Sequence, residues 1–179
     1  QFLADAKFPY AQGYGLTETA PLIAGGKPKK HYVGVIGKLV EHVDVKLADP
    51  DPETGVGEIL VKGPNVMQGY YDNPELNKAS FTEDGYFRTG DLGHLDKHGR
   101  LSIKGRTKTM ILGSGGENIY PELIESVINN QDFVTESLVI PEQGGLAALI
   151  KIDVEAFASK MALNVNEAKD EALKYVAKI

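Results

Sequence analysis

The hydrophobic positions in the middle of the chain fall into short apolar runs separated by Gly, Pro, Asn and Asp. In one run Val43 and Val45 alternate with charged residues. In another, Ile59 and Val61 occupy one face of the expected strand, and Leu60 falls on the opposite face. Successive side chains of a strand point to opposite faces, so this alternation is typical of strands with one buried face. The pattern therefore predicts a small β-rich module.

The same reasoning predicts the individual elements of this half. Residues 1–7 are predicted to end a helix, and residues 9–12 to form a short strand leading into a glycine-broken loop at residues 13–15. A helix is predicted to start at residues 72–75, where Pro74 occupies a position at which its missing N–H costs no hydrogen bond. The predicted strands of the module are residues 43–47, 58–62, 86–88, 92–95 and 101–103.

Beyond Arg106 the pattern changes to longer helical segments separated by two strands. The predicted helices are residues 121–129, 154–161 and 167–177, and the predicted strands are residues 134–140 and 147–152. The predicted fold class is therefore α+β, with a β-rich part followed by a small α+β unit. Residues 105–109 form the only strong candidate for a boundary.

Composition narrows the class of protein. The 179 residues carry a formal net charge of -6 and no dense run of Lys or Arg, so we expect no nucleic-acid partner. The lack of cysteine excludes disulfides and thiolate metal sites and fits a reducing compartment, so we expect a cytoplasmic protein. Its apolar stretches are far shorter than the roughly 20 residues of a spanning helix, so we expect at most peripheral contact with a membrane.

Five blocks of sequence carry the candidate chemistry. They are residues 13–18 (GYGLTE), 57–64 (GEILVKGP), 86–91 (YFRTGD), 105–108 (GRTK) and 113–121 (GSGGENIYP). In this order they resemble the adenylate-forming superfamily of AMP-binding enzymes: acyl-CoA synthetases, luciferases and the adenylation domains of peptide synthetases. The resemblance is dense from about residue 12 to about residue 125.

In the first block, glycines let the backbone approach a ligand, a phenol ring offers a stacking face, and a hydroxyl can donate to a phosphate oxygen. A carboxylate suits a hard cation such as Mg2+. The resemblance implies that Gly13, Tyr14, Gly15 and Thr17 bind ATP or AMP. It also implies that Thr17 and Glu18 are catalytic, and that Glu18 holds the metal. Taken alone, such a block is more often a plain turn.

The third and fourth blocks supply further candidates. An ionised carboxylate only accepts hydrogen bonds, so Asp91, predicted to follow a tight turn, could accept both ribose hydroxyls. The resemblance implies that role, implies a ribose contact for Arg106, and makes Lys108 the hinge, where many relatives carry Asp. The alternatives are a turn residue capping its own backbone for Asp91, and two solvated charges for Arg106 and Lys108.

The glycine-rich loop at residues 113–117 is interpreted as too flexible for a helix or strand. The resemblance implies that Gly115, Gly116 and Glu117 line the passage for CoA, and a flexible linker is the alternative. Pro121 is predicted to open the next helix. The second block and residues 67–71 after it are interpreted as structural.

The resemblance also implies a domain organisation. Residues 1–104 correspond to the end of the large AMP-binding domain with its β-rich subdomain, 105–109 to a hinge, and 110–179 to a small, truncated C-terminal domain. The family's phosphate-binding loop and its terminal Thr-Gly-Lys lysine have no counterpart in these residues. We therefore expect a piece of a longer enzyme that is inactive by itself.

The implied activity is that of an ATP-dependent acyl-CoA synthetase. It converts an acid and ATP to an acyl-adenylate and pyrophosphate, and then transfers the acyl group to CoA with release of AMP. ATP, Mg2+ and CoA are the implied co-substrates. Residues 105–112 and 117–121 resemble long-chain fatty-acid CoA ligases. Two alternatives stay open: an enzyme that loads a carrier protein, and a noncatalytic nucleotide-binding module.

Overall fold

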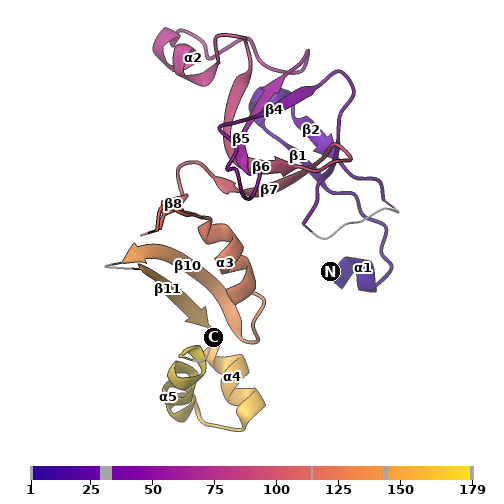
Figure 1. Ribbon diagram of the computed structural model, residues 1–179. Coiled ribbons are helices and arrows are strands. Elements are labelled where there is room, and N and C mark those ends of the chain that lie inside the picture. Colours follow the sequence, from indigo (N-terminus) through magenta and orange to yellow (C-terminus); the bar gives the residue numbers. More distant parts are fainter. Residues whose placement is uncertain (1, 29–33, 114, 143–144, 178–179) are drawn as a thin grey trace. The chain divides into compact units, whose positions relative to one another are not determined.

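A computed structural model describes the chain except for residues 1, 29–33, 114, 143–144 and 178–179. The chain divides into two compact units, Gln1–Lys108 and Thr109–Ile179 (Figure 1). The division falls within the segment expected to be a hinge. That this segment moves stays a prediction.

The first unit is built on a seven-stranded sheet in which all neighbouring strands are antiparallel (Figure 1). In spatial order its strands are β1 (Gly13–Gly15), β2 (Leu22–Gly25), β3 (Gly37–Leu39), β7 (Arg100–Arg106), β6 (Phe87–Leu95), β5 (Gly57–Lys62) and β4 (Asp44–Ala48). The predicted β-rich module is confirmed. Its sequence-distant strands β1 and β7 belong to one sheet, so residues from both ends of the unit are joined by it.

The core of this unit is formed by alternate residues of the strands. Ile23, Ile59, Val61 and Leu101 are fully buried and belong to one cluster. Leu60 was predicted to lie on the exposed face of its strand, but it is also buried. β5 lies between β4 and β6 in the interior of the sheet, and the burial of Leu60 shows that its second face is covered as well.

Two strand predictions were wrong in their bounds. Residues 9–12 are not a strand, because β1 lies on the glycine motif itself, where Tyr14 pairs with Ala24. The two strands predicted at 86–88 and 92–95 are one continuous strand, β6. The glycine that breaks the sequence pattern, Gly90, has φ of 70°, and the strand continues through it.

The first unit also contains the short helices α1 (Phe2–Asp5) and α2 (Pro74–Ser80) and the 3₁₀ turn η1 (Thr17–Thr19). The predicted start of α2 is confirmed. Asn73 caps it by accepting a hydrogen bond from the backbone N–H of Leu76, and Pro74 occupies the first turn. None of the seven residues of α2 is buried, so the helix adds nothing to the core.

The second unit confirms the predicted α+β pattern. It contains the hairpin β8 (Ile111–Leu112) and β9 (Asn118–Ile119), α3 (Pro121–Ile128), the hairpin β10 (Val134–Glu142) and β11 (Gly145–Ile152), and the helices α4 (Val154–Met161) and α5 (Val165–Val176). The two strands β8 and β9 were missed. Each has two residues, too few to show an alternation of polar and apolar positions.

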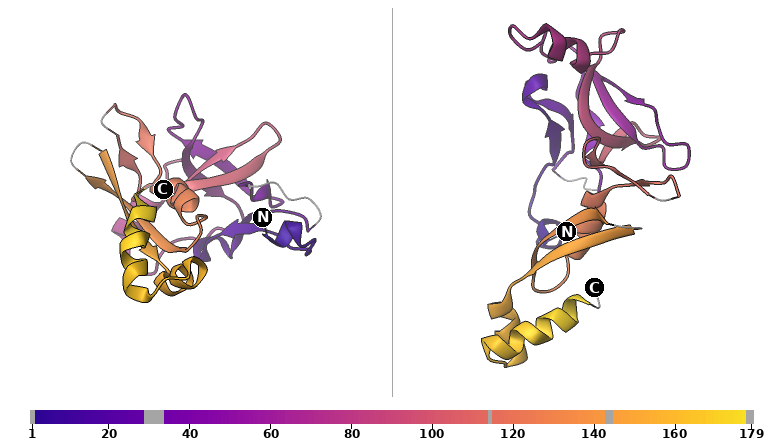
Figure 2. Two further views of the ribbon diagram at one scale, coloured as in Figure 1. Left: turned by 90° about the horizontal axis from the view of Figure 1, so that it is seen from below. Right: turned by 90° about the vertical axis from the view of Figure 1, so that its left-hand side faces the viewer.

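A second core lies where α4 and α5 pack against each other (Figure 2). Phe157 is 2% exposed and contacts Phe133 edge-on, with ring centroids 5.2 Å apart. Ala168 and Ala172 let the two helices approach closely, and both are buried. Among the described residues, no helix has both the length and the apolar character needed to cross a membrane.

Candidate functional site

Gly15 of the first block is required by the chain's own packing. A Cβ on Gly15 would lie 1.6 Å from the carbonyl oxygen of Pro21, and one on Gly13 would lie 2.9 Å from the Leu22 side chain. Only glycine permits β1 to approach β2 this closely. This packing places Tyr14, between the two glycines, on the sheet beside β2.

Asp91 is presented by an irregularity in β6 and does not follow a tight turn as predicted. Glu58 of β5 pairs with Leu92 and Leu60 pairs with Arg88, so three residues of β6 face the single residue Ile59. Thr89 in this bulge donates to the carbonyl of Ile59 at 2.8 Å. A bulge redirects a side chain out of the regular ladder. Asp91 therefore gains a position that a regular strand would not give it.

Tyr14, Asp91 and Arg106, which come from three separate sequence blocks, form one cluster. The Tyr14 hydroxyl donates to Asp91 Oδ2 at 2.7 Å, and Arg106 Nε lies 3.1 Å from Asp91 Oδ1. Asp91 and Arg106 are direct partners between β6 and β7. The Asp91 side chain is only 6% exposed, whereas that of Arg106 is 64% exposed. The cluster thus joins a buried carboxylate to an accessible guanidinium.

The electrostatics of the cluster keep Tyr14 protonated. Burial, and then the hydrogen bond to Asp91, raise the pKa of the Tyr14 phenol above its usual value of 10.0. Tyr14 and Arg106 each engage one oxygen of Asp91. Since a carboxylate has about four acceptor positions, each oxygen retains the capacity for another hydrogen bond. The alternative reading of Asp91 as a turn residue capping its own backbone finds no support in these contacts.

The residues of the first block divide into a buried and an accessible set. Thr19 is fully buried, and its hydroxyl lies 2.7 Å from the Pro21 carbonyl oxygen and accepts from the backbone N–H of Leu16. Thr17 is exposed at the start of η1, and Glu18 is half-buried. Thr19 therefore holds the turn, and Thr17 and Glu18 have the side chains that a ligand could reach.

Asn65 and Tyr70 contact the first block directly; Tyr70 lies in residues 67–71, which were interpreted from the sequence as structural. Asn65 Nδ2 donates to the carbonyls of Thr19 and Leu22, at 2.7 and 3.0 Å. Tyr70 donates its hydroxyl to Glu18 Oε1 at 3.0 Å, and its pKa is raised by burial and by that bond. Neither residue was predicted from the sequence to be part of the site. Each contact joins residues about 50 positions apart. No local sequence pattern indicates a contact over that separation, because only the folded chain brings the two residues together.

The donor set of Glu18 fits Mg2+, a hard cation that proteins commonly hold through one or two carboxylates while substrate phosphates and water complete the shell. Glu18 Oε1 accepts from Tyr70, and no residue in the described part of the chain donates a hydrogen bond to Oε2. Within that same part, no group of three or more His, Asp or Glu side chains is gathered. A dedicated protein cage for a metal is therefore not formed by these residues.

The two residues beside Lys108 are hydrogen-bonded to different parts of the chain, Thr107 to a residue before it and Thr109 to a residue after it. Thr107 donates both its backbone N–H and its hydroxyl to the carbonyl of Gly90, at 2.9 and 3.0 Å. On the other side, Thr109 donates its hydroxyl to Glu122 at the start of α3. Lys108 is exposed between these two anchors. Thr107 is thus tied to the first unit and Thr109 to the second, with Lys108 between them.

The glycine-rich loop closes the β8–β9 hairpin. The backbone N–H of Gly113 donates to the carbonyl of Glu117 at 2.8 Å, which joins the two ends of the loop. The Glu117 carboxylate lies over Gly113 and Gly115, where added Cβ atoms would approach it to 2.2 and 2.7 Å. Gly116 has φ of 87° with open space around it. Ser114 lies outside the described residues.

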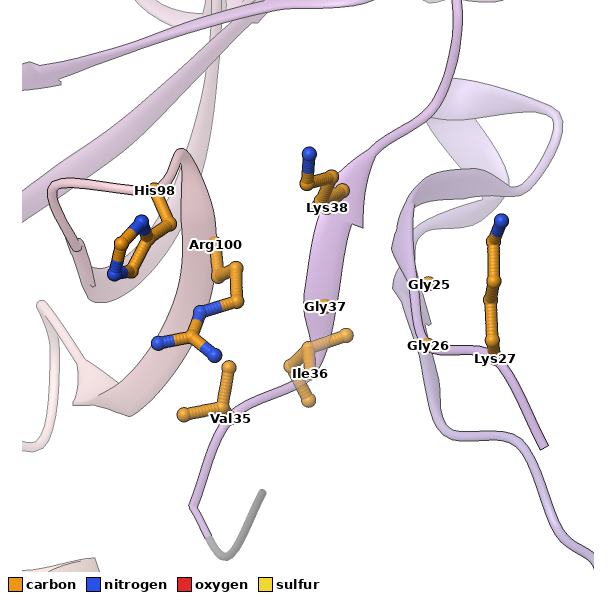
Figure 3. A pocket seen from close by; sticks show the side chains of 9 residues that line it. All are labelled: Gly25, Gly26, Lys27, Val35, Ile36, Gly37, Lys38, His98 and Arg100. Carbon is orange, nitrogen blue, oxygen red and sulfur yellow. The ribbon is translucent and has the colours of Figure 1, made fainter. Parts of the chain in front are cut away.

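A pocket of about 460 Å³ lies elsewhere in the first unit, lined by Gly25, Gly26, Lys27, Val35, Ile36, Gly37, Lys38, His98 and Arg100 (Figure 3). It contains none of the residues assigned to the predicted nucleotide site. Figure 3 shows the Lys27 and Lys38 amines well apart from the guanidinium of Arg100. Arg100 is already paired with Asp96 at 2.6 Å. These cations do not converge on one point, so the pocket supports no specific anion site.

Comparison with known proteins gives the same class. Residues 1–71 match the model of a protein family described as AMP-binding enzyme. Indoleacetate--CoA ligase of Aromatoleum aromaticum is 41% identical over 138 residues, which are 74% of this chain and 27% of that protein. Long-chain-fatty-acid--CoA ligase FadD15 of Mycobacterium tuberculosis is 35% identical over 157 residues, 87% of this chain and 25% of that protein.

Solved structures agree with these relatives. O-succinylbenzoate Coenzyme A Synthetase (MenE) from Bacillus subtilis, in complex with ATP and magnesium ion, matches with a TM-score of 0.75 and 36% identity, over 84% of this chain and 33% of that chain. ATP-bound MatB from Rhodopseudomonas palustris matches with a TM-score of 0.67 and 38% identity, over 80% and 30%.

These matches support membership in the AMP-binding enzyme family, which is the adenylate-forming superfamily. The relatives are CoA ligases with different acids in their names. The chain spans about a quarter of the length of these curated relatives, 27% of the indoleacetate ligase and 25% of FadD15. The matches thus support the resemblance at the level of the superfamily, and the long-chain fatty-acid assignment stays a prediction.

Proposed function

We propose that the chain is the part of an ATP-dependent acyl-CoA ligase that binds adenosine and carries the hinge. The observation that carries the proposal is the meeting of Tyr14, Asp91 and Arg106. These residues come from three sequence blocks, and they gather at a buried carboxylate with an accessible cation beside it. Such a carboxylate can accept hydrogen bonds from a ribose, and the cation can interact with ribose or phosphate oxygen.

Each residue has a role in this proposal. Tyr14 and Arg106 hold the Asp91 carboxylate in orientation, and Asp91 accepts hydrogen bonds from the ribose hydroxyls. The Tyr14 ring offers a surface on which the ligand can stack. Thr17 donates to a phosphate oxygen, and Glu18 holds Mg2+. When bound, Mg2+ neutralises charge on the phosphates. In the second unit, Gly115, Gly116 and Glu117 line the passage for CoA.

Lys108 is proposed as the hinge between an adenylating and a thioester-forming arrangement. The anchors at Thr107 and Thr109 support this role, because they leave Lys108 as the residue between two tied segments. Hinges are commonly a few residues that absorb changes of φ and ψ. The proposed reaction joins an acid to AMP with loss of pyrophosphate, and then moves the acyl group to the CoA thiol with loss of AMP.

We propose a fatty acid as the acid substrate. The similarity to FadD15 extends over 87% of this chain, against 74% for the indoleacetate and 2-succinylbenzoate ligases. That greater extent is what supports a fatty acid over an aromatic acid. The relatives that activate aromatic acids define the competing substrates that a test has to include.

The test is ATP–pyrophosphate exchange by the natural full-length protein with a panel of acids. The panel contains fatty acids of increasing length, indoleacetate and 2-succinylbenzoate, and Asp91→Ala serves as the control. Exchange that peaks with a fatty acid and collapses in the variant supports the proposal. A peak with an aromatic acid overturns the substrate assignment alone. No exchange with any acid overturns the ligase and favours a noncatalytic nucleotide-binding module.

A further inference from the structure

The Glu18 carboxylate is fixed from one side. Its Oε1 accepts the hydroxyl of Tyr70 at 3.0 Å, and its backbone carbonyl accepts the N–H of Met67 at 2.8 Å. The backbone and one oxygen of Glu18 are therefore both tied to the segment that contains Met67 and Tyr70. Its other oxygen, Oε2, accepts no hydrogen bond from the described residues and is left for a ligand.

Tyr70 is itself clamped by Asn77 of α2. The backbone N–H of Tyr70 donates to Asn77 Oδ1 at 2.7 Å, and Asn77 Nδ2 donates to the Tyr70 carbonyl at 2.9 Å. The Asn77 side chain thus pairs with both the backbone N–H and the carbonyl of Tyr70. Because Tyr70 lies in a loop, these two groups have no partners from a β-ladder. The clamp fixes the backbone from which the phenol reaches Glu18.

Gly69 permits the clamp. It has φ of 150°, and a Cβ at this position would lie 2.8 Å from Asn77 Oδ1 and 3.0 Å from its amide carbon and nitrogen. A side chain here would push Asn77 away from Tyr70. Asn77 is half-buried in a helix that otherwise places no residue in the core. The contribution of α2 is therefore the Asn77 side chain that holds Tyr70.

We propose that Tyr70 is a positioning residue for Glu18, supported by Asn77, and that it holds the carboxylate so that Oε2 is available to the Mg2+ of a bound Mg2+–ATP. This inference rests on the proposed function. A carboxylate held in advance loses less conformational freedom when it takes up the cation. The phenol can only donate to an ionised carboxylate, so it fixes the rotamer and does not compete for the metal.

The test is calorimetric titration of the natural full-length protein with ATP, once with Mg2+ and once with EDTA. Tyr70→Phe removes only the donating oxygen, and Tyr71→Phe is the matched control, since the neighbouring Tyr71 is 100% exposed. We expect Tyr70→Phe to weaken Mg2+–ATP binding about tenfold, the scale of a hydrogen bond to a charged group. ATP binding without Mg2+ should match that of Tyr71→Phe.

Two further variants make the outcomes distinguishable. Glu18→Gln should lose the Mg2+-dependent part of the affinity, and Asn77→Ala should lower it about threefold while keeping the phenol, even if Tyr70→Phe does not fold. A Tyr70→Phe protein that binds Mg2+–ATP like the control, while Glu18→Gln does not, overturns the inference alone. Wild-type protein that binds no ATP in either buffer overturns the proposed function and the inference with it.

Discussion

In the first unit Tyr14 contacts Asp91 across 77 positions of sequence, whereas in the second unit Glu117 folds back over glycines of its own loop. The first arrangement depends on a sheet that joins β1, β6 and β7, and its contacts are between side chains. The second depends on the backbone of one hairpin turn. The two candidate sites should therefore respond differently to substitution: the first to the loss of a polar atom, the second to the gain of a methyl group.

The largest effect is expected at Asp91, the residue that holds the first site together. Asp91→Ala leaves the Tyr14 hydroxyl without its acceptor and Arg106 without its carboxylate, and it removes the proposed ribose contact. We expect the affinity for AMP to fall on the order of a hundredfold, the scale of two charge-assisted hydrogen bonds. Calorimetric titration measures it. The exposed Asp170 of α5 provides the control, Asp170→Ala, and equal losses in the two variants would refute the assignment.

Lys108 is the last residue of the first unit. A substitution there tests whether the thioester step needs a hinge that the adenylation step does not. Lys108→Pro restricts φ at the residue between the Thr107 and Thr109 anchors. We expect thioester formation to fall roughly tenfold more than pyrophosphate exchange, because only the second step needs the hinge to turn. Lys108→Ala keeps the torsional freedom and should leave the ratio of the two rates unchanged. Equal losses in both half-reactions of Lys108→Pro would contradict the hinge.

Tyr14→Phe removes one hydrogen bond from the first site and preserves the ring. We expect a loss of about 1 kcal/mol in the free energy of unfolding. The raised pKa of Tyr14 adds a pH dependence. Since the unfolded phenol ionises near its usual pKa of 10.0 and the folded phenol does not, the stabilisation is present below pH 10 and is lost as the pH rises above it.

Urea unfolding of wild type, Tyr14→Phe and the exposed-tyrosine variant Tyr71→Phe between pH 7 and about 11 measures this dependence. The gap between wild type and Tyr14→Phe should be constant up to pH 10 and then narrow. A gap that stays constant, or that widens with pH, would contradict the burial of the Tyr14 hydroxyl against Asp91.

The smallest effect is expected in the loop of the second unit. Gly113→Ala places a methyl group 2.2 Å from the Glu117 carboxylate, which is the end of a flexible side chain and can swing away. We expect the free energy of unfolding to change by less than about 1 kcal/mol, and the affinity for CoA to fall about threefold. Gly145→Ala, where the Cβ meets open space, is the control. Unchanged CoA binding would show that Glu117 does not line the passage.

Several elements could be predicted because their signals are local. The proline and the capping asparagine announce α2, and α4 runs over the residues that its periodicity indicated. The bulge at Asp91 could not be predicted, because Gly90 is as compatible with a turn as with a strand that continues at positive φ. Likewise, no local pattern distinguishes Thr17, which is exposed, from Thr19, which is buried and holds its own turn.

The sequence by itself indicated the resemblance to the adenylate-forming superfamily, the α+β class and the residue types of the candidate sites, because these depend on short blocks and on the periodicity of apolar positions. Only the tertiary structure decided that Tyr14 and Arg106 converge on Asp91, and that Tyr70 and Asn77 hold Glu18. The physical reason is that the contacts of Tyr14 with Asp91 and of Tyr70 with Glu18 join residues 77 and 52 positions apart. At Asp91 the distances are set by strand pairing and by a bulge, which no single segment encodes. Tyr70 and Asn77 are only seven positions apart, but their contact requires the loop to fold back onto α2.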